Sequence, residues 1–218
     1  RGKVICEATG GDVFDAARRY RKLLPERGEH QRVGLLFRSE ETIEFLVAMF
    51  AAISRGLTVV PLYPNWDGPT QLSYLQRYGV RMLAVGDGFL KRTADWGESI
   101  DKVVNVSLTP EKIPEGEEDP APGDMFPPGL DGDHPVAWIF TSGTSGGMAK
   151  CTEISLSNMD AAIENIRDLD FLREGMVAHC PLSASHVFAF VVMTAFIALK
   201  PRRVLLSDVQ YLARLPQK

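Results

Sequence analysis

The chain has 218 residues, of which 45% are hydrophobic and 24% are charged, a composition typical of an ordinary globular protein. Its formal net charge of −4 argues against nucleic acid and anionic membrane surfaces as partners. Three cysteines, Cys6, Cys151 and Cys180, lie far apart and lack Cys-x-x-Cys spacing. This pattern argues against a disulfide framework and a structural metal, and it predicts a cytoplasmic protein.

Apolar runs alternate with helical patterns along the first half of the chain. The predicted helices there cover 12–24, 39–54, 69–78 and 89–96, and the predicted strands cover 33–37, 57–62, 81–85 and 102–106. We expect Ser39, with Glu40 and Glu41, to cap and charge the start of the second helix. Such alternation predicts an α/β fold, with mostly parallel sheet covered by helices on both faces.

Segment 108–134 differs from its surroundings because it is rich in proline and acidic residues, which cannot continue a helix or sheet for long. We interpret it as a solvated excursion within one amino-terminal domain that covers 1–218. The alternation then resumes, with strands over 136–140, 151–155, 177–180 and 204–206 and helices over 158–169, 187–199 and 208–215. Helix 187–199 is apolar but shorter than the ~20 residues of a membrane span, so we expect it to be buried.

A loop rich in glycine and hydroxyl side chains follows strand 136–140. It reads Phe-Thr-Ser-Gly-Thr-Ser-Gly-Gly-Met-Ala-Lys from Phe140 to Lys150. Glycines let backbone N–H groups approach an anion, hydroxyls add donors and the lysine adds positive charge, a grouping that suits a polyphosphate. The residues expected to bind the phosphates are Thr141, Ser142, Gly143, Thr144, Ser145, Gly146 and Lys150.

The same loop allows other interpretations. It could be a surface turn without chemistry, or part of a non-catalytic nucleotide-binding module. It is not the usual P-loop, in which lysine directly follows glycine. Residues 143–147 also fit Gly-x-Ser-x-Gly, which would make Ser145 the nucleophile of a serine hydrolase. The partners in that hydrolase would be Asp160, Asp168 or Asp170 and His179 or His186. That motif needs a helix directly after the serine, whereas 151–155 favours a strand.

The run 141–146, followed by Lys150, resembles the phosphate-binding signature of the adenylate-forming superfamily of acyl-CoA synthetases, luciferases and peptide-synthetase adenylation domains. It departs from that signature by one extra residue before Lys150 and by Cys151 after it. Segment 39–64 is similar to the scaffold that precedes the loop in acyl-CoA synthetases. The resemblance implies the amino-terminal subdomain of such an enzyme, closest in style to fatty-acyl-CoA synthetases.

Segment 181–190 resembles the part of this family that lines the acyl pocket, with Ala189 where glycine is common. The resemblance implies that His186 lies against the acyl carboxylate and Phe188 against its chain, with Lys150 and His186 as the catalytic residues. The alternative for His186 is a buried structural histidine at the start of an apolar helix.

The resemblance also implies ATP with Mg²⁺, coenzyme A as cosubstrate and a carboxylic acid, of the fatty-acid class, as substrate. The family's ribose aspartate and its mobile carboxyl-terminal domain have no counterpart in this sequence. We therefore expect weak nucleotide binding and little ligase activity from these residues alone.

Overall fold

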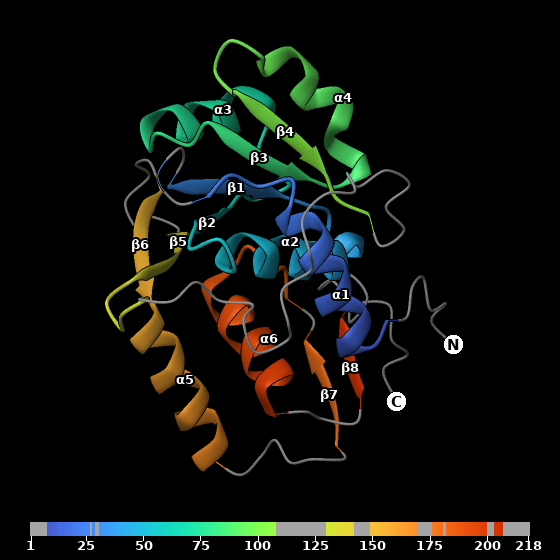
Figure 1. The fold of residues 1–218 in the computed structure, drawn as a ribbon, viewed down its shortest axis with the longest axis vertical. Coiled ribbons are helices and arrows are strands. Elements are labelled where there is room, and N and C mark those ends of the chain that lie inside the picture. Colours follow the sequence, from blue (N-terminus) through green and yellow to red (C-terminus); the bar gives the residue numbers. More distant parts are fainter. Residues whose placement is uncertain are drawn as a thin grey trace, which may run out of the picture. The chain divides into compact units, whose positions relative to one another are not determined.

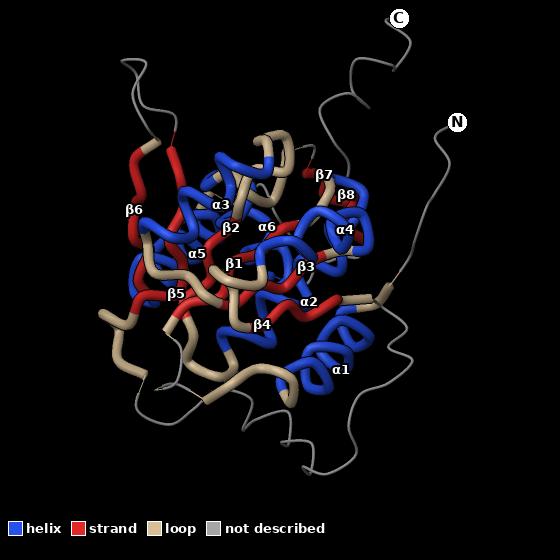
Figure 2. Tube along the Cα trace, turned by 90° about the horizontal axis from the view of Figure 1, so that it is seen from above, coloured by secondary structure: helices blue, strands red, loops and turns tan. Residues whose placement is uncertain are grey.

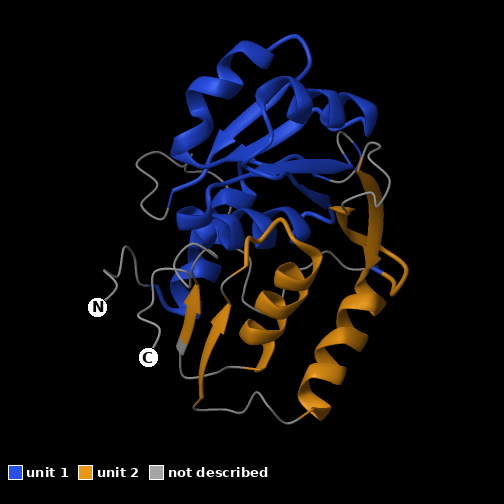
Figure 3. Ribbon diagram, turned by 180° about the vertical axis from the view of Figure 1, so that it is seen from behind, with its two compact units in different colours: residues 1–130 blue, residues 131–218 orange. Residues whose placement is uncertain are grey.

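The structure is a computed structural model that describes residues 8–26, 28, 31–107, 130–141, 149–169, 176–180, 182–199 and 203–206. The chain divides into two compact units, residues 1–130 and 131–218 (Figure 3). The predicted helix 208–215 and most of segment 108–134 lie outside the described residues.

Unit 1 contains a parallel four-stranded sheet with the order β4-β3-β1-β2 (Figure 1). Its strands are β1 (Arg32–Leu36), β2 (Thr58–Pro61), β3 (Met82–Val85) and β4 (Lys102–Asn105). All residues of β2 and β3 are buried, whereas β4 at the edge buries only Val104. This burial explains why the inner strands read as continuous apolar runs in the sequence.

Helices cover both faces of this sheet. They are α1 (Gly10–Arg21), α2 (Thr42–Ile53), α3 (Gly68–Arg77) and the short α4 (Leu90–Thr93). Helix α2 packs on β1 and β2, and α1 packs on α2 (Figure 2). On β1, Gly34 leaves so little room that an added Cβ would lie 3.0 Å from Leu75 of α3 and 2.5 Å from Leu83. The predicted α/β fold, mostly parallel with helices on both faces, is confirmed.

Two arginines tie the carboxyl ends of α1 and α2 together. Arg55 Nε donates to the carbonyl of Arg21 at 3.0 Å, and Arg21 Nε donates to the carbonyl of Ser54 at 3.3 Å. Arg55 is buried and also donates to Glu26 at 3.0 Å. Each arginine therefore satisfies a terminal carbonyl of the other helix, which the helix itself cannot bond.

The start of α2 differs from the prediction. Ser39 opens a 3₁₀ turn (Ser39–Glu41), and its side chain makes no cap; α2 itself begins at Thr42. Glu41 instead reaches back, and its Oε2 accepts the backbone N–H of Arg38 at 2.8 Å. The prediction of Ser39 as the cap was wrong. The cap position is Arg38, and the charged carboxylate of Glu41, three residues later, accepts its N–H.

Unit 2 begins with an antiparallel pair, β5 (Pro135–Thr141) and β6 (Lys150–Ser155). Helix α5 (Leu156–Asp168) follows directly, and β7 (Val177–Cys180) pairs in parallel with β8 (Arg203–Leu206). In the sequence, α6 (Val187–Leu199) connects β7 to β8, and it packs against α5, β5 and β7 (Figure 1). Among the described helices, α6 included, none has both the length and the apolarity needed to cross a membrane.

Candidate functional site

The hairpin formed by β5 and β6 is the frame of the candidate site. Ile139 and Phe140 of β5 are 0% and 1% exposed, so the strand is anchored in the core up to its last residue but one. Thr141, the next residue, is half-exposed. The hydroxyl-rich segment therefore leaves a rigid strand at the point where that strand reaches the surface.

Thr141 and Lys150 form the last register pair of the hairpin. The Thr141 hydroxyl donates to the Lys150 carbonyl over 3.4 Å, a long hydrogen bond. Residues 142–148 lie outside the described residues, and with them Ser142, Gly143, Thr144, Ser145 and Gly146. The structure thus brings together the two ends of the predicted loop, and the roles of the residues between them stay predictions.

Lys150 is exposed, and among the described residues its ammonium has no carboxylate partner. Directly opposed residues of an antiparallel pair place their side chains on one face, so Lys150 and Thr141 share a face of the hairpin. A strand-held lysine whose charge is not neutralised by a nearby acid can attract an anion such as a phosphate.

A cross-strand pair that the sequence did not reveal stiffens the hairpin. Trp138 of β5 lies opposite Glu153 of β6, and its indole Nε1–H donates to Glu153 Oε2 at 2.8 Å. The pair lies on the hairpin face opposite to that of Lys150, because side chains alternate along each strand. Its only sequence signal is a tryptophan and a glutamate in adjacent strands, and their register could not be read without the fold.

The connection after β6 does not fit a serine nucleophile elbow. Strand β6 occupies Lys150–Ser155, and α5 starts only at Leu156, where Ser155 and Asn158 form a capping box with bonds of 3.2 Å. An elbow would need a helix directly after its serine. Among the described residues after Ser145, no helix begins before Leu156, which argues against the hydrolase interpretation. Of its proposed partners, Asp160, Asp168 and His179 are exposed, and Asp170 lies outside the described residues.

His186 and Phe188 lie together at the start of α6. The His186 carbonyl accepts the N–H of Phe190 at 2.9 Å, and its ring Nδ1 accepts the N–H of Phe188 at 3.2 Å. His186 thus caps the helix, and an accepting Nδ1 leaves the proton of the neutral ring on Nε2. The side chain is exposed, so the alternative of a buried structural histidine is wrong in its burial, although the single bond at a helix start is present.

Phe188 is 60% exposed, an unusual position for a phenylalanine on a helix without charged residues. The site residues therefore fall into two pairs, Thr141 with Lys150 and His186 with Phe188, on elements of the same unit. Helix α6 packs against β5, with His186 immediately before its first turn and Phe188 within that turn. Of the other described histidines, His134 is buried and His179 is exposed.

No group of three metal-ligating side chains occurs among the described residues. Cys151 is half-exposed and Cys180 is buried. Burial raises the pKa of the Cys180 thiol, and the nearby backbone of Leu182 partly offsets this by a hydrogen bond.

Solved structures similar to this chain include the N-terminal domain of FACL13 from Mycobacterium tuberculosis, at 18% identity and a TM-score of 0.73, covering 91% of this chain and 50% of that one. O-succinylbenzoate coenzyme A synthetase (MenE) from Bacillus subtilis, in complex with AMP, matches at 17% identity and a TM-score of 0.74, covering 97% and 53%. A malonyl-CoA ligase with methylmalonyl-CoA and AMP bound matches at 18% and 0.67, covering 90% and 38%.

These likenesses confirm the expected fold, and the chain spans about half the length or less of the solved chains that it matches. No curated protein matches the sequence. The family model described as "AMP-binding enzyme" matches residues 5–213. The resemblance identified from the loop at 141–150 is thereby confirmed at the level of the family, and the chain belongs to the AMP-binding enzymes.

Proposed function

We propose that this chain is the amino-terminal part of an ATP-dependent acid–thiol ligase that activates a carboxylic acid of the fatty-acid class. The observation that carries the proposal is the Thr141–Lys150 pair, which closes a loop of glycines and hydroxyls at the end of a buried strand. Membership of the AMP-binding family and similarity in fold to coenzyme A ligases support it.

ATP with Mg²⁺ would supply an α-phosphate that the acid's carboxylate attacks, so that pyrophosphate leaves and an acyl-AMP forms. The thiol of coenzyme A would then take the acyl group and release AMP. The work of this chain in the first step is to hold the triphosphate and offset the charge on the departing pyrophosphate. The loop's N–H groups and hydroxyls would bind phosphate oxygens, and Lys150 would contribute the counter-charge.

His186 and Phe188 would meet the acid. With Nδ1 occupied by the helix cap, the Nε2–H of His186 can donate to a carboxylate oxygen. Phe188 presents an exposed ring two residues later, which would pack on the first carbons of the acyl chain. Because the chain spans only part of its solved relatives, we propose that it has little ligase activity without the remainder of such an enzyme.

The decisive variant is Lys150→Ala in a protein that carries this chain together with the remaining domains of a ligase. We expect acid-dependent exchange between ATP and pyrophosphate to fall about 100-fold, the scale of removing one preorganised charge or donor. Lys102→Ala is the matched control, because Lys102 is also an exposed lysine on a strand, in unit 1.

Unchanged exchange in Lys150→Ala would contradict the role of Lys150. ATP binding that depends on Lys150, with no exchange for any acid tested, would instead indicate a non-catalytic nucleotide-binding module. Stoichiometric labelling of Ser145 by a fluorophosphonate probe would favour the hydrolase interpretation over the ligase.

A further inference from the structure

The register of the hairpin formed by β5 and β6 shifts by one residue near the start of β5. Pro135 pairs with Ser155, and the next pair is Ala137 with Ile154. Val136 is therefore an extra residue in β5, which makes the irregularity a β-bulge. Pro135 has no N–H to donate to a ladder, and a bulge is one of the few places where a sheet accepts proline.

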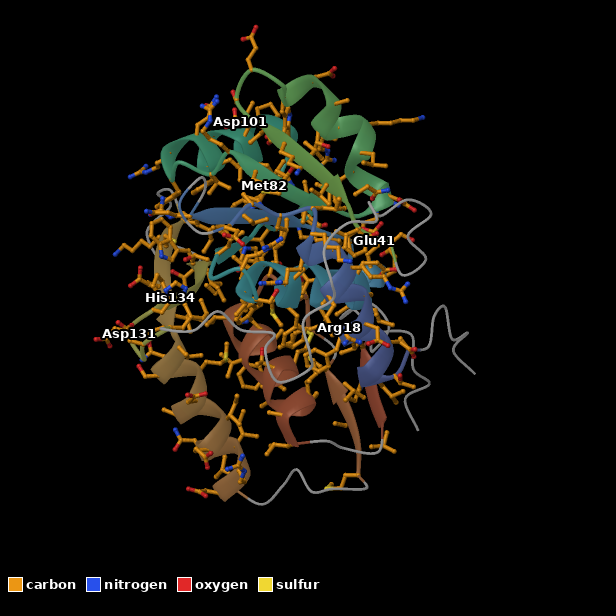
Figure 4. All side chains as sticks on the ribbon, in the orientation of Figure 1. Arg18, Glu41, Met82, Asp101, Asp131 and His134 are labelled. Atoms are coloured by element: carbon orange, nitrogen blue, oxygen red, sulfur yellow. The ribbon has the colours of Figure 1, made fainter. Side chains whose placement is uncertain are left out.

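The end of the hairpin farther from the loop is held by backbone hydrogen bonds. The N–H of Leu156 donates to the carbonyl of His134 at 2.9 Å. The N–H of Ser157 donates to the carbonyl of Gly132 at 2.8 Å. His134 N–H in turn donates to the carbonyl of Asp131 at 3.1 Å, and both residues are labelled in Figure 4. Because this end is held in place, the bulge decides the register of the part nearer the loop.

The bulge determines which face of the hairpin Lys150 occupies. With the bulge, Lys150 lies opposite Thr141. Without it, the pairing of Pro135 with Ser155 would continue residue by residue and would place Lys150 opposite Phe140. Directly opposed residues share a face and side chains alternate along a strand, so Lys150 would then lie on the face opposite to Thr141. One residue of register therefore decides whether the lysine and the threonine can contact the same ligand.

The connecting segment and the burial of β6 do little to choose between these registers. Residues 142–149 join the strands, and this segment is much longer than the two-residue turns that fix the register of short hairpins. Of the β6 residues beyond the bulge, Ile154 is buried, whereas those from 150 to 153 are exposed or half-exposed. A strand with so few buried side chains has a register that the hydrophobic effect specifies only weakly.

A side-chain hydrogen bond distinguishes the two registers. Trp138 and Glu153 are direct partners in the bulged register, and the indole N–H donates to the carboxylate at 2.8 Å. In the unbulged register Glu153 would lie opposite Ala137, and Trp138 would lie opposite Thr152. The indole and the carboxylate would then be on different faces, so their hydrogen bond can form only when the bulge is present. The charge on the acceptor strengthens this bond.

We propose that Trp138 and Glu153 are positioning residues for phosphate binding, because their hydrogen bond holds the register in which Lys150 and Thr141 share a face. This positioning role rests on the proposed function, in which Lys150 supplies charge to the phosphates of ATP. Trp138 and Glu153 lie on the other face of the hairpin and act through the strands that carry Thr141 and Lys150.

Glu153→Ala tests this role in a protein that carries this chain together with the remaining domains of a ligase. ATP would bind only the molecules in the bulged register, so its apparent affinity falls with their fraction. We expect the KM for ATP in ATP–pyrophosphate exchange to rise by about threefold or more, with kcat changed by less than about twofold.

Two further variants separate the hydrogen bond from the mere presence of a glutamate. Glu153→Gln keeps an oxygen that can accept the indole N–H, so its KM should stay within about twofold of the parent value. Glu164→Ala removes an exposed carboxylate from α5 of the same unit and is the matched control, with an unchanged KM. A Glu153→Gln variant as impaired as Glu153→Ala would overturn the proposal.

Trp138→Phe removes the same hydrogen bond from its other end and keeps an aromatic ring. Since either change breaks one shared interaction, the variant with both Trp138→Phe and Glu153→Ala should raise KM no further than either change alone. Increases that multiply in the double variant would mean that the two side chains act separately, contrary to the proposal.

The register itself can be read from the 218-residue chain without any ligand. In the parent we expect nuclear Overhauser effects between backbone protons of Thr141 and Lys150. In Glu153→Ala, effects between Phe140 and Lys150 should appear, because a rise in KM of the expected size requires the unbulged register to be well populated. A Glu153→Ala spectrum with only the parent contacts would overturn the proposal, whatever the exchange assay shows.

Lys150→Ala separates this proposal from the proposed function. If Lys150→Ala leaves exchange unchanged while Glu153→Ala shifts the register, the proposed function fails and the hydrogen bond still holds the register. If Lys150→Ala lowers exchange but Glu153→Ala, with a shifted register, keeps the parent KM, the positioning role is wrong.

Discussion

The segments that follow two buried strands, β1 in unit 1 and β5 in unit 2, differ in whether their charged groups have partners within the protein. After β1, Glu41 uses both carboxylate oxygens to accept the backbone N–H groups of Arg38 and Gly88. Gly86 and Gly88 leave room for the Glu41 carboxylate and the Arg38 guanidinium. After β5, the chain returns to a strand partner, and Lys150 is left exposed without a carboxylate partner among the described residues.

This difference separates a scaffold from a candidate site. Polar groups that satisfy one another contribute to stability and have little left for a ligand, whereas a rigidly held charge without a partner can bind one. Fold-level analogy alone would have placed a ligand at the switch point of unit 1, where the neighbouring strands β1 and β3 end. The hydrogen bonds favour the hairpin of unit 2, which also contains the ends of the run that resembles the family's phosphate-binding signature.

Phe140→Ala has the largest expected effect on stability and tests whether the hairpin of unit 2 is supported independently of unit 1. Phe140 is 1% exposed and anchors β5 immediately before Thr141. We expect the variant to lose about 3–5 kcal/mol of stability, because a large buried side chain leaves a cavity. Thermal unfolding would measure the loss, and hydrogen exchange would locate it. If unit 1 amides lost as much protection as those of β5 and β6, the two regions would not be independent supports.

Gly86→Ala tests the hydrogen bonds that Glu41 makes after β1 and β3 in unit 1. The added methyl group would displace the Glu41 carboxylate, and the loss of its two hydrogen bonds should cost about 1–2 kcal/mol. Chemical denaturation would measure this cost, and ATP binding would serve as the second readout. Weaker ATP binding by the folded variant would show that the switch point of unit 1 contributes to the site after all.

Ser155→Ala tests how far the hairpin depends on the helix that follows it. The Ser155 hydroxyl accepts the N–H of Asn158 at 3.2 Å and caps α5, so its loss should cost about 1 kcal/mol. Exchange of the first α5 amides should quicken. ATP–pyrophosphate exchange by a complete ligase carrying the change should stay within about twofold of the parent, because β5 already holds Lys150 in register; a larger loss would make α5 part of the site's support.

Much of this fold could be predicted because its elements have sharp local signals. The strand Val177–Cys180 and the helix Val187–Leu199 were predicted with the bounds that the structure shows. Their apolar runs are bounded by polar residues and proline, which decide the ends without tertiary help. The apolar strands of unit 1 were found within about one residue of their predicted ends for the same reason.

The parts that were missed depend on partners distant in sequence or on competing local bonds. Glu41 bonds Gly88, and no periodicity links them. The predicted helix 89–96 is only four residues of α-helix flanked by 3₁₀ turns. Thr93 lies within it, and its hydroxyl bonds the carbonyls of Phe89 and Leu90, a local alternative that weakens regular helix.

For the site, the sequence predicted the loop and both of its ends, and the structure supplied the register that joins Thr141 to Lys150. The exposure of His186 and Phe188 could not be predicted, because an apolar run shows no polar face from which to infer orientation.

Phe188→Ala has the smallest expected effect on stability and separates the two kinds of region most clearly. At 60% exposure the Phe188 side chain buries little surface, so we expect the free energy of unfolding to fall by less than about 0.5 kcal/mol. The same substitution at the buried Phe140 should cost far more. If Phe188 packs on the acyl chain, the same change should shift the preferred acid length in ATP–pyrophosphate exchange by a complete ligase. The neighbouring Val187→Ala, on the same turn of α6, is the matched control. A loss of stability like that of a core residue, with the length profile unchanged, would mean that Phe188 belongs to the scaffold.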